Sequence, residues 1–199
     1  SRSVPNLGKL QGDTVQLTID ERIQRVAQTA VARQVEEYDA KAGYGLVMKA
    51  DTGEVLAVTN TPHFDPNRFG DFTSEDWRLR TVTDTFEPGS IFKPFVLAAA
   101  LEEGTVSLNT VFDCEDGAVR IGKHTVRDSH PHERLTTAEI IQKSSNIGAY
   151  KIAKTIGKER TYEYIRSFGF GSRTGLGMRG EQPGLVWPPN RWADVTFAN

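Results

Sequence analysis

Two short motifs in this sequence of 199 residues combine side chains that could carry out acyl transfer. The first is Ser90-Ile91-Phe92-Lys93, in which a hydroxyl and an amine lie three residues apart. At the start of a helix this spacing puts both groups on one face, about one turn apart, so that the lysine can take the proton of the serine. We therefore expect the Ser90 hydroxyl to lie within hydrogen-bonding distance of the Lys93 nitrogen.

The surroundings of Lys93 decide whether it can act as a base, because a free lysine has a pKa of roughly 10.4. Residues 91–103 are apolar and rich in alanine, which predicts a buried helix that desolvates the amine and lowers its pKa. The positive end of this helix would lie near Ser90, where an oxyanion would develop. The same four-residue pattern also occurs on solvated helices that have no catalytic role.

The second motif is Lys143-Ser144-Ser145-Asn146, which lies between two predicted helices. The Ser144 hydroxyl, which we expect to lie close to both Ser90 and Lys93, could relay a proton, and the Asn146 carboxamide could bind a peptide amide. The alternative interpretation is that these residues only cap a helix. The presence of both motifs in one chain favours chemistry.

Composition and charge exclude several other functions. The sequence has 24 Lys and Arg against 26 Asp and Glu, a net charge of −2, so charge gives no basis for binding nucleic acid or an anionic membrane surface. Its longest apolar run, residues 95–101, is far shorter than the roughly 20 residues that cross a bilayer. A single cysteine and four scattered histidines form neither a disulfide nor a metal-ligand pattern, so no metal or cofactor is expected.

Other polar residues receive structural interpretations. We expect Cys114 to be half-buried, with a pKa raised by the acidic residues beside it. Asp128 and Arg134 are predicted to form a structural pair. The loop histidines are expected at the surface and are His124, His130 and His132.

Periodicity and turn signals predict the elements that must position both motifs, in one domain with at most two lobes. A β-hairpin is expected over residues 43–60, with its turn at 51–53. Capping boxes are expected at Thr18–Glu21 and Thr136–Glu139, each at the start of a helix. The predicted helices span residues 20–38, 74–79, 91–103, 148–155 and 159–168. Residues 61–72 are expected to form a loop and the tail from 171 to be irregular, while residues 105–134 show only a weak pattern, with a turn expected at 113–117.

The sequence resembles the transpeptidase domain of class B penicillin-binding proteins. S-x-x-K is a motif of penicillin-binding proteins and class A β-lactamases. The resemblance runs from about residue 15 to the end and implies an α+β fold in which an antiparallel sheet carries a helical lobe. It rests on Glu87-Pro88-Gly89-Ser90-Ile91-Phe92-Lys93-Pro94, Lys143-Ser144-Ser145-Asn146, Thr52-Gly53-Glu54-Val55-Leu56-Ala57 and Phe168-Gly169-Phe170-Gly171.

The resemblance implies a peptidoglycan D,D-transpeptidase and a role for each motif residue. Ser90 would attack the D-Ala-D-Ala carbonyl of a stem peptide, and Lys93 would take its proton. Ser144 would pass a proton to the departing D-Ala, and Asn146 would bind the donor peptide. β-Lactam antibiotics would acylate Ser90 as mimics of D-Ala-D-Ala. The full-length protein is expected at the periplasmic face of the bacterial inner membrane, with a membrane glycosyltransferase as partner.

One motif of the family, Lys-Thr/Ser-Gly on a strand that completes the oxyanion hole, is missing from the sequence. We therefore expect a chain truncated at both ends, without a membrane anchor: residues 1–14 as a linker from a pedestal domain and 15–199 as the N-terminal part of the transpeptidase domain. Such a chain should be helix-rich, with few strands, and poorly acylated or inactive. The free edge of its hairpin should either self-associate or be covered by helix 20–38.

Two alternative functions stay open at this point. A serine β-lactamase would share the fold, but Ser144-Ser145-Asn146 differs from the S-D-N form of those enzymes. A non-catalytic β-lactam sensor or binding module would keep both Ser90 and Lys93, so the motif does not separate it from an enzyme.

Overall fold

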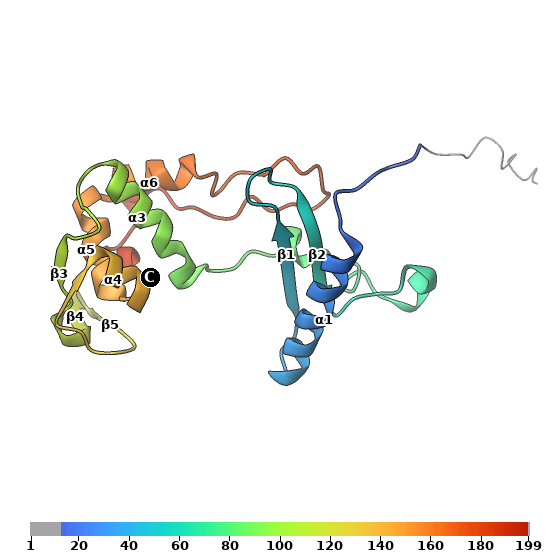
Figure 1. Cartoon of the computed structure of the whole chain (residues 1–199), viewed down its shortest axis with the longest axis horizontal. Helices are drawn as coiled ribbons and strands as arrows, with labels where there is room; N and C mark the ends of the chain where they lie inside the picture. Colours follow the sequence, from blue (N-terminus) through green and yellow to red (C-terminus); the bar gives the residue numbers. More distant parts are fainter. Residues whose placement is uncertain (1–12, 199) are drawn as a thin grey trace, which may run out of the picture. The chain divides into compact units, whose positions relative to one another are not determined.

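The computed structural model describes residues 13–198, which fall into two compact units, one ending at Asp84 and the other beginning at Thr85. Residues 1–12 of the expected linker 1–14 lie outside the described residues. Both units contain helices and antiparallel strand pairs, so the α+β class predicted from the sequence is confirmed (Figure 1). Within the described part of the chain, no helix is both long and apolar enough to cross a bilayer.

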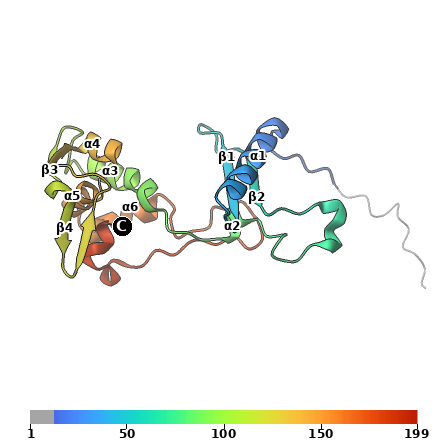
Figure 2. The same cartoon turned by 90° about the horizontal axis from the view of Figure 1, so that it is seen from below.

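In the first unit, a long helix packs against a two-stranded antiparallel hairpin (Figures 1 and 2). The hairpin turn lies where the sequence predicts it, and Gly53 has the positive φ of 75° that the turn requires. The prediction of a helix at residues 74–79 is wrong. The carboxylate of Asp76 accepts the N–H and hydroxyl of Thr73, which holds a turn there instead. The elements are α1 (Glu21–Glu37), β1 (Gly43–Met48), β2 (Val55–Thr61), the 3-10 segment η2 (Pro66–Asp71) and α2 (Arg80–Thr83).

The start of α1 is capped by Asp20 and not by the predicted capping box. The Asp20 carboxylate accepts the backbone N–H groups of Arg22 and Ile23, and the hydrogen bond from Ile23 lowers the pKa of Asp20. Thr18 donates its hydroxyl to the carbonyl of Val55 at 2.6 Å, so it ties the entering chain to β2. The helix therefore begins where predicted, for a different reason.

Helix α1 also supplies partners to the free edge of the hairpin. The Gln24 carboxamide donates to the Val58 carbonyl and accepts the Val58 N–H, both at 2.8 Å, as a neighbouring strand would. The backbone N–H of Asp20 donates to the Leu56 carbonyl at 2.9 Å. Of the two outcomes expected for the hairpin edge, contact with the helix and its N-terminal cap is found at Leu56 and Val58 of β2.

One face of the hairpin is shaped for close contact with α1. A Cβ atom at Gly43 would lie 2.6 Å from a methyl carbon of Val35, so a larger residue would push the helix away. The other face carries exposed apolar side chains on alternate positions of β1, which are Tyr44, Leu46 and Met48.

The second unit contains most of the helices and two small strand pairs, β3 with β6 and β4 with β5. Most of these strands lie within residues 105–134, where the sequence shows only a weak pattern, because strands of three or four residues are too short to show a period. The turn expected at residues 113–117 is present as the 3-10 turn at Glu115–Gly117. The elements are η3 (Gly89–Phe92), α3 (Lys93–Glu102), β3 (Val111–Asp113), η4 (Glu115–Gly117), β4 (Ala118–Ile121), β5 (His124–Arg127), β6 (Arg134–Thr136), α4 (Thr137–Lys143), α5 (Asn146–Ile156), α6 (Lys158–Ser167), η5 (Pro189–Arg191) and η6 (Asp194–Ala198).

The core of this unit forms around α5, which packs against α3 and α4 (Figure 1). The predicted capping box at the start of α4 is confirmed. A Cβ atom on Gly148 of α5 would lie within 2.5 Å of Ile140 on α4, so the glycine permits the close approach of the two helices. Cys114 is fully buried here instead of half-buried, and burial is the main cause of its raised pKa.

Helix α3 is less buried than its apolar composition predicts. Ala99 and Ala100 are its buried residues, whereas Ile91 in the preceding turn is 64% exposed. Residues that are apolar on every face do not reveal which face a neighbour covers, and α5 packs against part of this helix.

Candidate active site

Ser90 and Lys93 lie on the same side of a 3-10 turn. Gly89 begins this turn with a positive φ of 58°, and the backbone N–H of Lys93 donates to the carbonyl of Ser90. Side chains three residues apart eclipse each other in a 3-10 turn. The S-x-x-K spacing thus aligns the two side chains as predicted, with the Ser90 side chain exposed and Lys93 half-buried.

Lys93 Nζ donates three hydrogen bonds, and all of them go to the second motif. The acceptors are the carbonyl of Ser144 at 2.6 Å, Oγ of Ser144 at 3.0 Å and Oδ1 of Asn146 at 2.7 Å. The prediction that Ser144 meets Lys93 is confirmed. The expected hydrogen bond between Ser90 and Lys93 is not formed, because the three protons of the ammonium are all used by these acceptors.

The pKa of Lys93 is lowered from its ordinary value of 10.5, as the sequence predicts. Burial is the main cause, since it disfavours the charged ammonium, and the negative charge of Asp128 acts in the opposite direction. A lowered pKa increases the fraction of neutral amine near neutral pH, which is the form that accepts a proton.

Phenylalanines on either side of Lys93 anchor the first motif to the Phe-Gly-Phe-Gly segment. Phe92 packs edge to face against Phe170, with ring centroids 5.1 Å apart, and Phe95 packs against Phe168 and Phe170 at 5.1 and 5.0 Å. Gly171 has a φ of 77° and lies against the Arg166 side chain, where a Cβ atom would clash. The ring contacts therefore tie the beginning of α3 to the segment that follows α6.

The second motif forms the turn between α4 and α5, and its residues divide two tasks. Ser145 caps α5, because its Oγ accepts the N–H of Gly148 at 2.9 Å. Ser144 ends α4 with φ 56° and ψ 39°, a left-handed conformation that costs a residue with a Cβ atom about 1–2 kcal/mol. The capping interpretation therefore holds for Ser145, whereas the side chains of Ser144 and Asn146 point to Lys93.

Asp128, directly after β5, is a residue of this site that sequence reasoning missed. Its Oδ1 accepts the backbone N–H groups of Asn146 at 2.6 Å and Ile147 at 3.1 Å, and its Oδ2 accepts the Ser145 hydroxyl at 2.6 Å. The predicted pair with Arg134 is wrong, because the carboxylate binds the positive N-terminal end of α5 instead. No spacing rule links residues 17 to 19 positions apart, so the sequence carried no signal for this contact.

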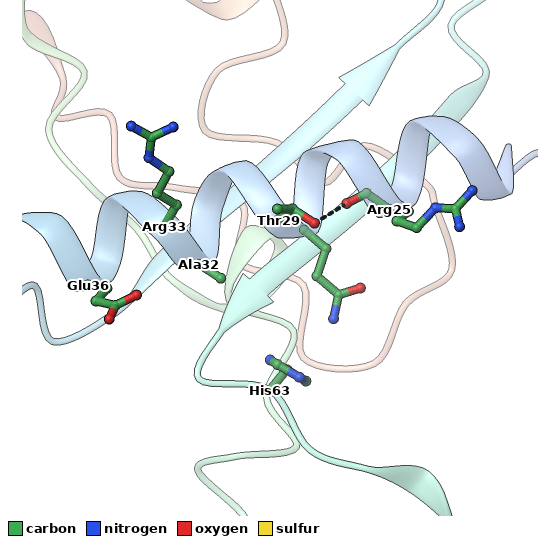
Figure 3. Close-up of a pocket in the computed structure, with 7 residues that line it drawn as sticks. Arg25, Thr29, Ala32, Arg33, Glu36 and His63 are labelled. Atoms are coloured by element: carbon green, nitrogen blue, oxygen red, sulfur yellow. Dashed lines mark hydrogen bonds between the residues drawn. The ribbon is translucent and has the colours of Figure 1, made fainter.

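The first unit contains a shallow groove of its own. It has a volume of about 450 Å³ and is lined on α1 by Arg25, Arg33 and Glu36, with His63 from the segment after β2 (Figure 3). None of the motif residues line it. Within residues 13–198, no three His, Cys, Asp or Glu side chains are grouped so that they could hold a metal ion.

Comparison with known proteins identifies the family. The sequence matches the penicillin binding protein transpeptidase domain over residues 43–199. The chain therefore belongs to the penicillin-binding protein transpeptidase family, in agreement with the class B resemblance noted from its motifs.

Individual relatives agree with this assignment. The chain is 41% identical over 193 residues to the probable peptidoglycan D,D-transpeptidase PenA of Neisseria gonorrhoeae, covering 97% of this chain and 33% of that protein. A crystal structure of a peptidoglycan glycosyltransferase from Burkholderia ambifaria has a TM-score of 0.81 and 36% identity, covering 92% of this chain and 54% of that one. The apo TP domain of Burkholderia pseudomallei penicillin-binding protein 3 has a TM-score of 0.80 and 35% identity, covering 92% and 50%.

This chain corresponds to only part of the length of these relatives. The chain spans 33% of the length of the PenA protein and 50% to 54% of the two solved chains.

Proposed function

We propose that the protein carrying this chain is a peptidoglycan D,D-transpeptidase that works through a serine acyl-enzyme. The single observation that carries the proposal is the position of Lys93. Its half-buried amine has a lowered pKa, contacts both Ser144 and Asn146, and lies on the same side of the turn as Ser90. These groups are what an activated serine nucleophile requires.

The reaction begins when Lys93 loses a proton. A neutral amine has two N–H groups and a lone pair, so one of its three contacts is released and the lone pair can accept the Ser90 hydroxyl proton. Ser90 Oγ forms a bond to the penultimate D-Ala carbonyl carbon, and the C–N bond to the terminal D-Ala breaks. The proton taken by Lys93 passes through the Ser144 hydroxyl to the nitrogen of the departing D-Ala. An acceptor amine from a second stem peptide then bonds to the acyl carbon, the ester bond to Ser90 Oγ breaks, and a proton of that amine returns to Ser90 Oγ through Lys93.

Substrate and inhibitor binding follow from the same chemistry. The Asn146 carboxamide binds the donor peptide, and β-lactams acylate Ser90 as mimics of D-Ala-D-Ala. We also propose a location at the periplasmic face of the inner membrane, where stem peptides are exposed, and a membrane glycosyltransferase as partner. The sequence of 199 residues contains no Lys-Thr-Gly or Lys-Ser-Gly, so we propose that this chain alone is acylated slowly, since loss of one oxyanion donor costs roughly 10²–10³ in rate.

The test is acyl transfer by the full-length protein from a stem peptide ending in D-Ala-D-Ala to an amine acceptor. The proposal predicts release of D-Ala together with formation of the cross-linked peptide, and loss of both in Ser90→Ala. Rapid release of hydrolysed penicillin without peptide transfer would show a β-lactamase. A stable penicillin adduct on a protein that never transfers peptide would show a sensor.

A further inference from the structure

The turn that carries the second motif is held by one carboxylate, that of Asp128. The N–H groups of the first three residues of α5 all have acceptors: Asp128 takes those of Asn146 and Ile147, and Ser145 takes that of Gly148. Ser145 in turn donates its hydroxyl to Asp128. Ser145 accepts only the N–H of Gly148, so Asp128 supplies the acceptor for the other two N–H groups at the start of α5.

The same segment also fixes the direction of the Asn146 carboxamide. Asn146 Nδ2 donates to the carbonyl of Arg127 at 2.8 Å, which leaves Oδ1 directed at Lys93. Arg127 and Asp128 are adjacent at the end of β5, so one short piece of chain sets both the backbone and the side chain of Asn146. Ser144, next to this anchor, remains in a left-handed conformation that the backbone would otherwise leave.

We propose that Asp128 is a positioning residue for acyl transfer, because its carboxylate holds the turn that brings Ser144 and Asn146 to Lys93. This inference rests on the proposed function. Asp128 acts through other groups and does not itself donate to or accept from Lys93.

The charge of Asp128 provides a signature that a purely structural contact lacks. Lys93 contacts the uncharged side chains of Ser144 and Asn146, and Asp128 is the charged group that acts on it among the described residues. The negative charge favours the ammonium form. Removing it should lower the pKa of Lys93, so the acidic limb of the acylation profile, which rises as Lys93 loses its proton, should move to lower pH.

The experiment measures acylation of the full-length protein by a fluorescent penicillin as a function of pH. In Asp128→Asn, we expect the second-order rate constant at its pH optimum to fall about 10²-fold, as displaced catalytic groups do, and the acidic limb to move to lower pH. Asp128→Glu keeps the charge, so its limb should stay in place although its rate falls. Asp113→Asn is the matched control: its carboxylate accepts the Glu115 N–H on the same unit, and its rate and limb should equal those of the wild type.

Ser145→Ala provides a second variant if Asp128→Asn fails to fold. It removes one of the three donors to Asp128 and retains the charge, so we expect a lower rate constant with an unmoved limb. The inference about Asp128 would be overturned if Asp128→Asn kept the wild-type rate constant and acidic limb. It would also be overturned if Ser145→Ala, when that variant is used, kept the wild-type rate constant. Neither result would contradict the proposed function. Absence of labelling on wild-type Ser90 would overturn the proposed function itself, which distinguishes the two failures.

Discussion

Oδ1 of Asn146 lies 2.7 Å from the ammonium nitrogen of Lys93, although the two residues are 53 positions apart in the sequence. This contact joins the two motifs into one site. It also brings the base of the proposed reaction to the group that would bind the donor peptide, so a change at either residue should affect acylation.

Replacing Lys93 with arginine tests its role as a base. Lys93→Arg keeps a positive charge but cannot lose a proton, so we expect acylation by a fluorescent penicillin to disappear while the melting temperature changes little. Lys151→Arg is the control, because Lys151 is also a half-buried lysine that donates to a backbone carbonyl, that of Asp113, and to Glu115. Normal acylation of Lys93→Arg would remove Lys93 from the mechanism.

The pH dependence of acylation should report the lowered pKa of Lys93. Because the neutral amine is the active form, the rate should rise with pH and level off once pH exceeds the pKa of Lys93. Burial lowers this pKa from 10.5, so the rise should be complete at a pH below that of an ordinary lysine. A rate constant that levels off only above pH 10.5, as an ordinary lysine would make it do, would contradict this interpretation. Stopped-flow measurement of penicillin acylation over the stable pH range provides the profile.

Substitutions of Ser144 should separate stability from activity. Ser144→Gly and Ser144→Ala both remove an acceptor of Lys93, and we expect both to slow acylation. Glycine relieves a left-handed strain of about 1–2 kcal/mol and loses about 0.5–1 kcal/mol to unfolded-state entropy, whereas alanine keeps the strain. Chemical denaturation should therefore find Ser144→Gly more stable than Ser144→Ala; the reverse order would show that the left-handed turn is not a source of strain.

The contact between α4 and α5 should be sensitive to a single methyl group. Gly148→Ala places a Cβ atom about 2.5 Å from Ile140, so we expect a loss of about 1–3 kcal/mol in unfolding free energy as the helices separate. Acylation should fall as well, because Ser144 ends α4 and Asn146 begins α5. Gly70→Ala is the control, since a Cβ atom there meets nothing within 4 Å. Equal stability of the two variants would mean that the helices are not closely packed.

Much of the fold could be predicted from the sequence where local signals are strong. The hairpin, its turn, the long first helix and the Thr136 capping box have periodic or positional signatures, and each was confirmed. The short strands between residues 111 and 136 have no such signature, because a three-residue strand is set by its partner and not by its own pattern.

The candidate site divides in the same way. The types and spacing of Ser90 and Lys93 indicate a shared face, and their alignment in one turn follows from local geometry. The approach of Ser144 to Lys93 was expected because a hydroxyl that relays a proton must lie near the base. The role of Asp128 depends on a contact between the end of β5 and the start of α5, which only the folded chain brings together.

The covalent bond that a β-lactam forms with the protein shows directly whether Ser90 is the nucleophile. The full-length protein is treated with a β-lactam, digested, and analysed by mass spectrometry. We expect one adduct, on the peptide containing Ser90 and at the Ser90 oxygen, absent from both Ser90→Ala and Lys93→Arg. An adduct on another residue, or an adduct that persists in Ser90→Ala, would contradict it.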